Sequence, residues 1–131
     1  MVIKQDIPVI CKRVDTFPNG IKEAFDAIFK EFGMVGRENY GISYMDEKFQ
    51  IVYQVAVTEK FDGEADGTNY ESYTIRKGDW LCVTLTDWMS KTGQIKDVFG
   101  QLMRDPRVDK TSIGLEWYKS DKEMQCMMRL F

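Results

Sequence analysis

The chain has 131 residues, of which 44% are hydrophobic and 30% charged, and its 18 basic and 21 acidic side chains give a net charge of −3. This length suits one domain with a hydrophobic core, and the composition excludes a disordered chain. The sequence has no run of Lys and Arg, so we expect no direct contact with nucleic acid. It has neither a signal-peptide pattern nor the roughly 18 consecutive apolar residues of a membrane helix, so we expect a cytoplasmic protein without a membrane partner.

The chain contains no histidine and three widely spaced cysteines, Cys11, Cys82 and Cys126. The absence of histidine excludes Ser–His and Cys–His catalysis and removes the commonest transition-metal ligand. The cysteines lie in apolar, strand-like segments, which predicts buried, reduced thiols rather than disulfides. We therefore expect no metal ion and no cofactor.

The first predicted elements are a strand over residues 7–14 and a helix over residues 20–32. The strand segment is rich in β-branched residues. In the helix segment, apolar residues recur at helical spacing and form one stripe, which consists of Ile21, Ala24, Phe25, Ile28, Phe29 and Phe32. Asn19 is the predicted N-cap of this helix, and Gly33 is its predicted end, because glycine tolerates the left-handed conformation.

A hairpin is predicted next, with strands at 41–45 and 49–57. The segment 34–40 joins the helix to the hairpin. Gly36 within it and Gly33 just before it allow the backbone to move, so we interpret the segment as a rim or lid that can move. The acidic, glycine-containing stretch 58–69 reads as a solvated linker.

The second half repeats this order. A strand is predicted at 80–87, followed by a helix at 93–104 with Thr92 as its cap, and by a hairpin at 114–118 and 124–131. The apolar stripe of the second helix consists of Ile95, Val98, Phe99, Leu102 and Met103.

The two halves align as an internal repeat. IKEAFDAIF (21–29) aligns with IKDVFGQLM (95–103), and GISYM (41–45) aligns with GLEWY (114–118). This alignment arises either by chance or from the duplication of a βαββ unit, and a duplication would give the domain a pseudo-two-fold axis. We therefore predict an α+β fold in one domain (1–131), with halves at about 1–57 and 70–131 and both helices on one face of a mainly antiparallel sheet.

The strand pattern also predicts a site on the sheet. Leu81, Val83 and Leu85 can face the helices, which points Trp80 away from them. Glu116 and Tyr118 share a face of their strand, and we group them with Trp80 on the face away from the helices. Such a face is too apolar for plain solvent contact and too polar for plain core, so we expect a ligand groove between the halves.

Several segments together resemble the gyrase-inhibitor-like small-molecule-binding family, which is also the effector-binding domain of bacterial transcription activators. They are TFPNGIKEAFDAIF, YGISY, IVYQVAV, ESYTIRKGDW and GLEWYKSDKEMQCMMRL, and they run in order over residues 7–131. The resemblance implies a duplicated βαββ fold with a pocket acid in a Glu-x-aromatic strand, here Glu116 and Tyr118. It also implies an aromatic near the pocket in the strand after a Lys-Gly turn, here Trp80 after Gly78. No segment remains for a helix-turn-helix, so we expect a stand-alone member.

Five residues are the candidate ligand-binding set: Glu116, Tyr118, Trp80, Tyr44 and Tyr53. Aromatic faces stack on flat ligands and attract organic cations. Two plainer interpretations of Glu116 remain open at this point, an exposed strand residue or a partner of Arg129 in an ion pair. Its counterpart in the first half is Ser43, as expected for one acidic group in one shared pocket. We expect Trp88 to be a packing or rim residue.

These features favour a receptor or sequestering protein for a small amphipathic aromatic compound. If Glu116 binds this compound, we expect the compound to be a cation. One carboxylate and a tyrosine are a thin catalytic set, so we assign no catalytic residue; the enzymatic alternative is a metal-free hydrolase of electrophilic compounds. A third hypothesis is an inhibitor of a partner protein that uses the acidic segment 58–69. We expect a monomer or a weak homodimer.

Overall fold

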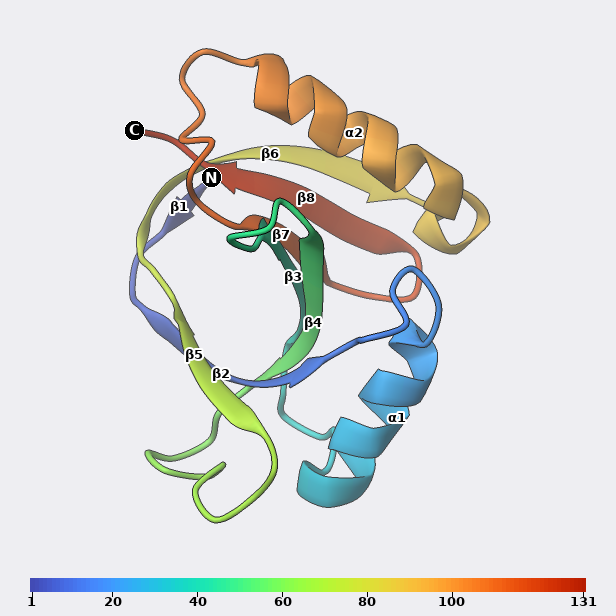
Figure 1. The fold of residues 1–131 in the computed structure, drawn as a ribbon, viewed down its shortest axis with the longest axis vertical. Coiled ribbons are helices and arrows are strands. Elements are labelled where there is room, and N and C mark those ends of the chain that lie inside the picture. Colours follow the sequence, from blue (N-terminus) through green and yellow to red (C-terminus); the bar gives the residue numbers. More distant parts are fainter.

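Eight strands form one antiparallel sheet in the computed structural model, which describes residues 1–131. Its order is β1-β6-β8-β7-β3-β4-β2-β5. The strands are β1 (Val2–Ile3), β2 (Ile7–Arg13), β3 (Asn39–Met45), β4 (Ile51–Thr58), β5 (Glu71–Ile75), β6 (Gly78–Thr86), β7 (Gly114–Tyr118) and β8 (Glu123–Arg129). The sheet curls into a half-barrel, and the helices α1 (Ile21–Phe32) and α2 (Thr92–Arg104) lie on its outer side (Figure 1). The predicted α+β fold class is confirmed.

The strand order is symmetric about the boundary between β3 and β7. Outward from this boundary, β3, β4 and β2 follow one another on one side, and β7, β8 and β6 on the other. At the boundary, Gly41 lies opposite Glu116 and Ser43 lies opposite Gly114. The sequence repeat makes these two pairs equivalent, so the register itself has the predicted pseudo-two-fold symmetry.

Two short edge strands were not predicted. β1 precedes β2 in the chain but pairs with β6, and β5 precedes β6 but pairs with β2. Each half therefore adds an edge strand to the other half. β1 has only two residues and β5 is half polar, so neither carries the apolar alternation that identifies a strand in sequence.

The predicted helix caps are correct at one of three positions. Gly33 ends α1 with φ 83°, and its N–H donates to the Phe29 carbonyl at 2.8 Å. The Asn19 prediction is wrong, because Gly20 precedes α1 in a left-handed conformation and no side chain caps the helix. Thr92 is the first residue of α2 rather than its cap, since a 3₁₀ turn (Trp88–Ser90) leads into the helix.

The apolar core has an inner and an outer part. Alternate strand residues fill the inside of the curl, and these are Ile3, Val9, Cys11, Tyr40, Ile42, Ala56, Ile75, Trp80, Leu115 and Met127. On the outer side, one cluster packs under α1 around Ile10, Ile28 and Val55, and another packs under α2 around Leu102, Met124 and Cys126. The three cysteines are free thiols; Cys11 and Cys126 are buried as predicted, whereas Cys82 is half-buried. Neither helix is long and apolar enough to cross a membrane.

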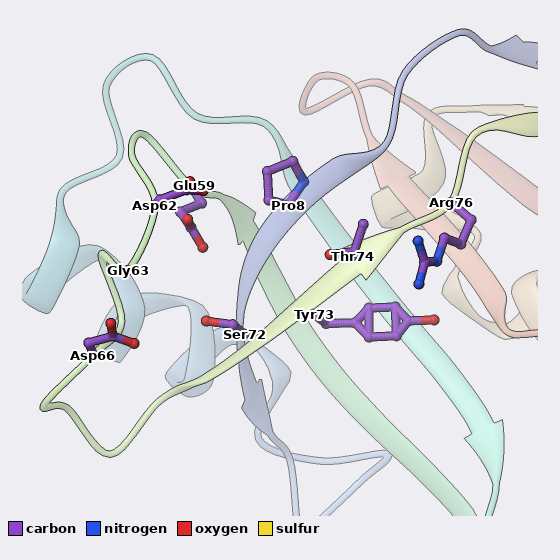
Figure 2. A pocket seen from close by; sticks show the side chains of 9 residues that line it. All are labelled: Pro8, Glu59, Asp62, Gly63, Asp66, Ser72, Tyr73, Thr74 and Arg76. Carbon is purple, nitrogen blue, oxygen red and sulfur yellow. The ribbon is translucent and has the colours of Figure 1, made fainter.

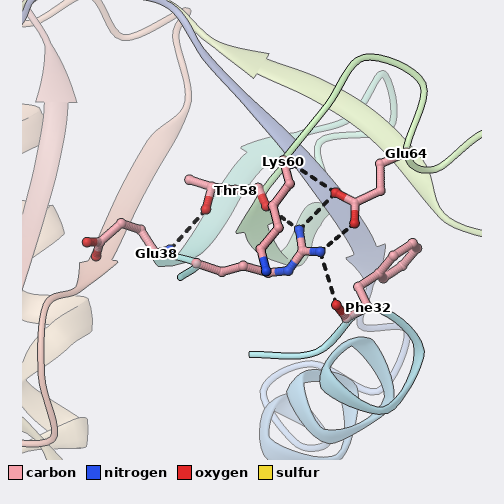
Figure 3. Close-up of polar contacts among 6 residues, drawn as sticks. Phe32, Glu38, Thr58, Lys60 and Glu64 are labelled. Carbon is pink, nitrogen blue, oxygen red and sulfur yellow. Dashed lines mark hydrogen bonds and ion pairs between the residues drawn. The ribbon is translucent and has the colours of Figure 1, made fainter. Parts of the chain in front are cut away.

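The segment 34–40 is anchored by a buried ion pair, drawn with its neighbours in Figure 3. The Arg37 guanidinium forms a two-pronged contact with the Glu64 carboxylate and donates to the carbonyls of Thr58, at 2.7 Å, and Phe32, at 3.0 Å. The Arg37 side chain is only 1% exposed. Removing either partner of such a pair would leave an uncompensated buried charge. This anchoring opposes our interpretation of the segment as a mobile lid. Glu64 and the buried Ala65 show that the linker is partly packed.

Gly41 is the closest-packed position of the central strands. A methyl group there would collide with the Tyr53 hydroxyl and the Glu116 carboxylate. We expect Gly41→Ala to destabilise the protein by about 1–3 kcal/mol, the usual cost of overpacking. Gly100→Ala is the matched control, because its new methyl group meets no atom within 4 Å and alanine favours a helix. Urea unfolding midpoints compare the two, and equal midpoints would show that the space above Gly41 is not confined.

Candidate ligand-binding site

Three polar side chains meet on the outer face of the central strands. The Tyr53 hydroxyl, from β4, donates to Glu116 Oε1 at 2.5 Å, and the Tyr118 hydroxyl, from β7, donates to the same oxygen at 2.8 Å. The two hydroxyls are 2.9 Å apart. Glu116 is 7% exposed, and it fits because Gly41 opposite it has no side chain. We call Tyr53, Glu116 and Tyr118 the polar triad.

Burial dominates the electrostatics of the polar triad. It raises the pKa of the Glu116 carboxyl above its usual value, while the hydrogen bonds from the two tyrosines partly oppose that rise. It also raises the pKa values of Tyr53 and Tyr118 well above that of a free phenol, and the charge of Glu116 raises them further. Both phenols are therefore donors at neutral pH.

No cation of the protein balances Glu116. None of the five ion pairs of the structure includes it. Arg129, the partner considered from the sequence, has its guanidinium beside Gly78, at the far end of the neighbouring strands. Glu116 is thus neither an exposed strand residue nor half of an ion pair with Arg129, and both plainer interpretations are wrong.

Three aromatic side chains cover the polar triad. Phe17, from the loop before α1, stacks on Tyr53 with ring centroids 4.6 Å apart and planes 11° apart. Phe25 of α1 meets Tyr118 edge-on at 5.7 Å, and Trp88, before α2, approaches the same ring at 5.0 Å. Phe17 itself is 36% exposed. Glu116 is therefore shielded by rings of which Phe17 is the most exposed and Phe25 and Trp88 are half-buried.

The outer face continues from the polar triad along β3 and β4 with small and then uncovered apolar residues. Ser43 and Gly114 lie opposite each other, beside the pair of Gly41 and Glu116. Two residues further along β3, Met45 lies opposite Ile51, and the two are 60% and 58% exposed. This cross-strand pair forms an apolar surface next to the site.

The predicted site residues fall into two groups. Tyr53, Glu116 and Tyr118 form the polar triad, whereas Trp80 lies inside the curl among Ile3, Leu115 and Met127. Tyr44 alternates with Tyr40 and Ile42, which face the inside, and it is 41% exposed. Grouping Glu116 with Trp80 on one face is therefore wrong: Glu116 and Tyr118 are on the helix side of the sheet.

Sequence analysis did not identify Phe17 or Phe25 as part of this site. Phe25 belongs to the helical stripe, which predicts an ordinary core residue, and its contact with Tyr118 of β7 arises from the tertiary packing. Phe17 lies in the turn before α1, and the one sequence signal available was an aromatic residue in a turn. Trp88 is a packing residue at the edge of the site, as predicted.

A hollow of about 660 Å³ lies elsewhere, beside the edge strand β5. Figure 2 shows its lining, which is mainly polar: Pro8, Glu59, Asp62, Gly63, Asp66, Ser72, Tyr73, Thr74 and Arg76. Its carboxylates belong to the acidic segment 58–69, on which the inhibitor hypothesis rests. No group of three or more acidic or cysteine side chains in the protein is arranged to hold a metal ion.

The raised pKa of Glu116 gives a pH-dependent stability. Its contribution to stability is fully present below the unfolded-state pKa of about 4.3 and is lost as the pH rises through the higher folded-state pKa. Glu116→Gln removes this loss. We expect the mutant to match the wild type in free energy of unfolding near pH 4 and to exceed it by about 1–3 kcal/mol at pH 8.

Urea unfolding of both proteins across this pH range provides the measurement. Glu47→Gln, at an exposed position, is the control and should show no such trend. A difference between wild type and Glu116→Gln that stays constant with pH would contradict the raised pKa.

Comparison with known proteins identifies the fold. No known protein family's sequence profile matches the chain. No curated protein sequence matches it either. Three solved structures share the fold over nearly their whole lengths. An integron cassette protein from the mobile metagenome of Vibrio cholerae has a TM-score of 0.67 at 11% identity, over 100% of this chain and 94% of its own.

The protein SAV2435, solved with bound tetraphenylphosphonium, has a TM-score of 0.64 at 11% identity, over 100% of this chain and 92% of its own. A Staphylococcus aureus protein, provisionally described as a bacterial transcription regulation protein, has a TM-score of 0.61 at 10% identity, over 98% of this chain and 95% of its own. At these identities the similarity establishes a shared fold: a curled antiparallel sheet with two outer helices.

Proposed function

We propose that this protein binds a small amphipathic aromatic cation at the polar triad. The observation that carries the proposal is the buried Glu116 carboxylate, which has two hydroxyl donors and no cationic partner. Taking a carboxylate out of water is costly unless a positive charge compensates it. A ligand cation would supply that charge.

The surroundings of Glu116 suit an aromatic cation in particular. The hydroxyls of Tyr53 and Tyr118 contact the carboxylate, and the Trp88 ring packs on Tyr118. Aromatic faces attract organic cations by about 0.5–2 kcal/mol each. The exposed pair of Met45 and Ile51 extends the apolar surface. SAV2435, which shares the fold, was solved with tetraphenylphosphonium, and this supports the same ligand class here.

A ligand must displace part of the aromatic cover to reach Glu116. Phe17 is the best candidate, because it comes from a loop, borders solvent and stacks on Tyr53 in the manner of a ligand ring. In the free protein, Phe17 would then occupy the place that an aromatic group of the ligand takes on binding.

Its biological role would be that of a cytoplasmic receptor or sequestering protein, acting as one domain and as a monomer or weak homodimer without contacting nucleic acid. The resemblance to the gyrase-inhibitor-like family supports this role. The similarity to a protein provisionally linked to transcription regulation supports a bacterial sensing role.

A metal-free hydrolase is the second candidate, favoured by the 2.5 Å hydrogen bond between Tyr53 and Glu116. A carboxylate with a raised pKa can accept a proton from water, and a phenol can donate one to a leaving oxygen. Styrene oxide and the wild-type protein distinguish the candidates: formation of the diol, absent with Glu116→Gln, identifies a hydrolase, and binding of cations without turnover identifies a receptor.

The main test compares two ligands of the same shape and opposite charge, tetraphenylphosphonium and tetraphenylborate. Glu116→Gln should weaken tetraphenylphosphonium binding by about 1–3 kcal/mol, the range of a charge-assisted contact in a desolvated site. It should not weaken tetraphenylborate binding. Calorimetric titration measures both, with Glu47→Gln as the control. Unchanged binding of the cation to Glu116→Gln would remove Glu116 from the site.

Phe17→Ala tests the cover. Losing a stacked pair worth about 0.5–1.5 kcal/mol makes the open form easier to reach, so tetraphenylphosphonium should bind roughly twofold to thirteenfold more tightly. Phe61→Ala, an equal truncation at an exposed loop residue, should leave its affinity unchanged. Weaker binding by Phe17→Ala would make Phe17 a wall of the site instead of its cover.

A further inference from the structure

A second hollow lies inside the curl, on the face opposite to the polar triad. It has a volume of about 440 Å³, and seven of its nine lining residues are hydrophobic. The β1 segment forms one wall with Ile3, and the central strands form the other with Tyr40, Leu115, Trp117 and Met127. This volume is within the range of small-molecule pockets, about 300–1,000 Å³. We call it the inner groove.

The inner groove and the polar triad use alternate residues of the same strand. Along β7, Leu115 and Trp117 point into the groove, while Glu116 and Tyr118 point to the outer face. A ligand in the groove would therefore touch no atom of the polar triad, and the two sites would be separated by the thickness of one sheet.

The polar groups at the inner groove are the Lys4 ammonium, the Gln5 amide, the Tyr40 hydroxyl and the α-ammonium of Met1, which donates to the Trp80 carbonyl at 2.8 Å. Lys4 is its one charged side chain, and no carboxylate lines it. Burial, with a smaller effect from the charge of Glu38, raises the pKa of Tyr40 to about 12, so this phenol stays protonated. Glu38, which is near the groove, accepts a hydrogen bond from the Trp117 indole at 3.0 Å. The indole N–H of Trp80, in the same inner cluster, is buried without an acceptor.

We propose that the inner groove binds a small apolar carboxylate, with its hydrocarbon part between Ile3 and Leu115 and its carboxylate towards Lys4. The charge preference is the reverse of that expected at Glu116. An apolar chain gains about 0.8 kcal/mol for each methylene that it buries, so chain length should set the affinity and Lys4 the charge selectivity. This site does not depend on the proposed function of the polar triad.

The three tryptophans allow each site to be observed separately. Trp117 lines the inner groove, whereas Trp88 packs on Tyr118 at the outer face. In ¹⁵N-labelled protein, decanoate should move the Trp117 indole signal in a saturable way and leave that of Trp88 in place. Tetraphenylphosphonium should do the reverse. Decyltrimethylammonium, with the same chain and a positive charge, should bind more weakly than decanoate.

Two lysine variants test the charge. Lys4→Glu should weaken decanoate binding at least about threefold, because it replaces an attraction by a repulsion at a partly solvated position. Lys122→Glu, the same change in the exposed turn between β7 and β8, should have no effect. Glu116→Gln should also bind decanoate normally, which separates this test from that of the polar triad.

The proposal is overturned if decanoate gives no saturable shift of Trp117 below its micelle concentration, or if it shifts Trp88 instead. It is also overturned if decyltrimethylammonium binds as tightly as decanoate, or if Lys4→Glu and Lys122→Glu weaken binding equally.

Discussion

The burial of one carboxylate governs the arrangement of the outer face. Glu116 lies on the central strand β7 and is 7% exposed, and the hydroxyls of Tyr53 and Tyr118 both donate hydrogen bonds to its Oε1. Space for this arrangement comes from position 41, where any side chain would collide with Tyr53 and Glu116. Burial, to which the aromatic rings contribute, raises the pKa of this carboxyl, so the shielding from water and the shifted pKa have the same cause.

The polar triad is possible because a duplicated fold has lost its symmetry at one place. Glu116 corresponds to Ser43 in the repeat, and Tyr118 corresponds to Met45. The strand registers make Tyr53 and Cys126 equivalent, since they lie opposite Ser43 and Glu116. A symmetric pair of carboxylates so close to the axis would repel each other at the centre of the sheet. With small or apolar groups at the equivalent positions of the other half, a single buried carboxylate remains near the axis.

The fold could be predicted from the sequence because its signals are local and occur twice. The helical stripes and the GISYM and GLEWY strands carry their periodicity within a dozen residues, and each copy supports the other. The face of Glu116 could not be predicted so well. Alternation shows that Glu116 and Tyr118 point the same way, but only the partners of β7 decide which way that is. Phe17 escaped notice for a related reason, since a loop residue acquires its neighbours entirely from tertiary structure.

The exchange of edge strands links the order of synthesis to the order of assembly. β2 is made early, but its outer edge stays unpaired until β5 emerges, and β1 finds its partner only after β6 has been made. Pairing residues 2 and 3 with residues 79 and 78 closes one of the longest loops in the protein. Such non-local contacts carry a large loop-closure entropy and form late. Residues 2 and 3 therefore have to wait, unpaired, until β6 has been made before the half-barrel can be completed.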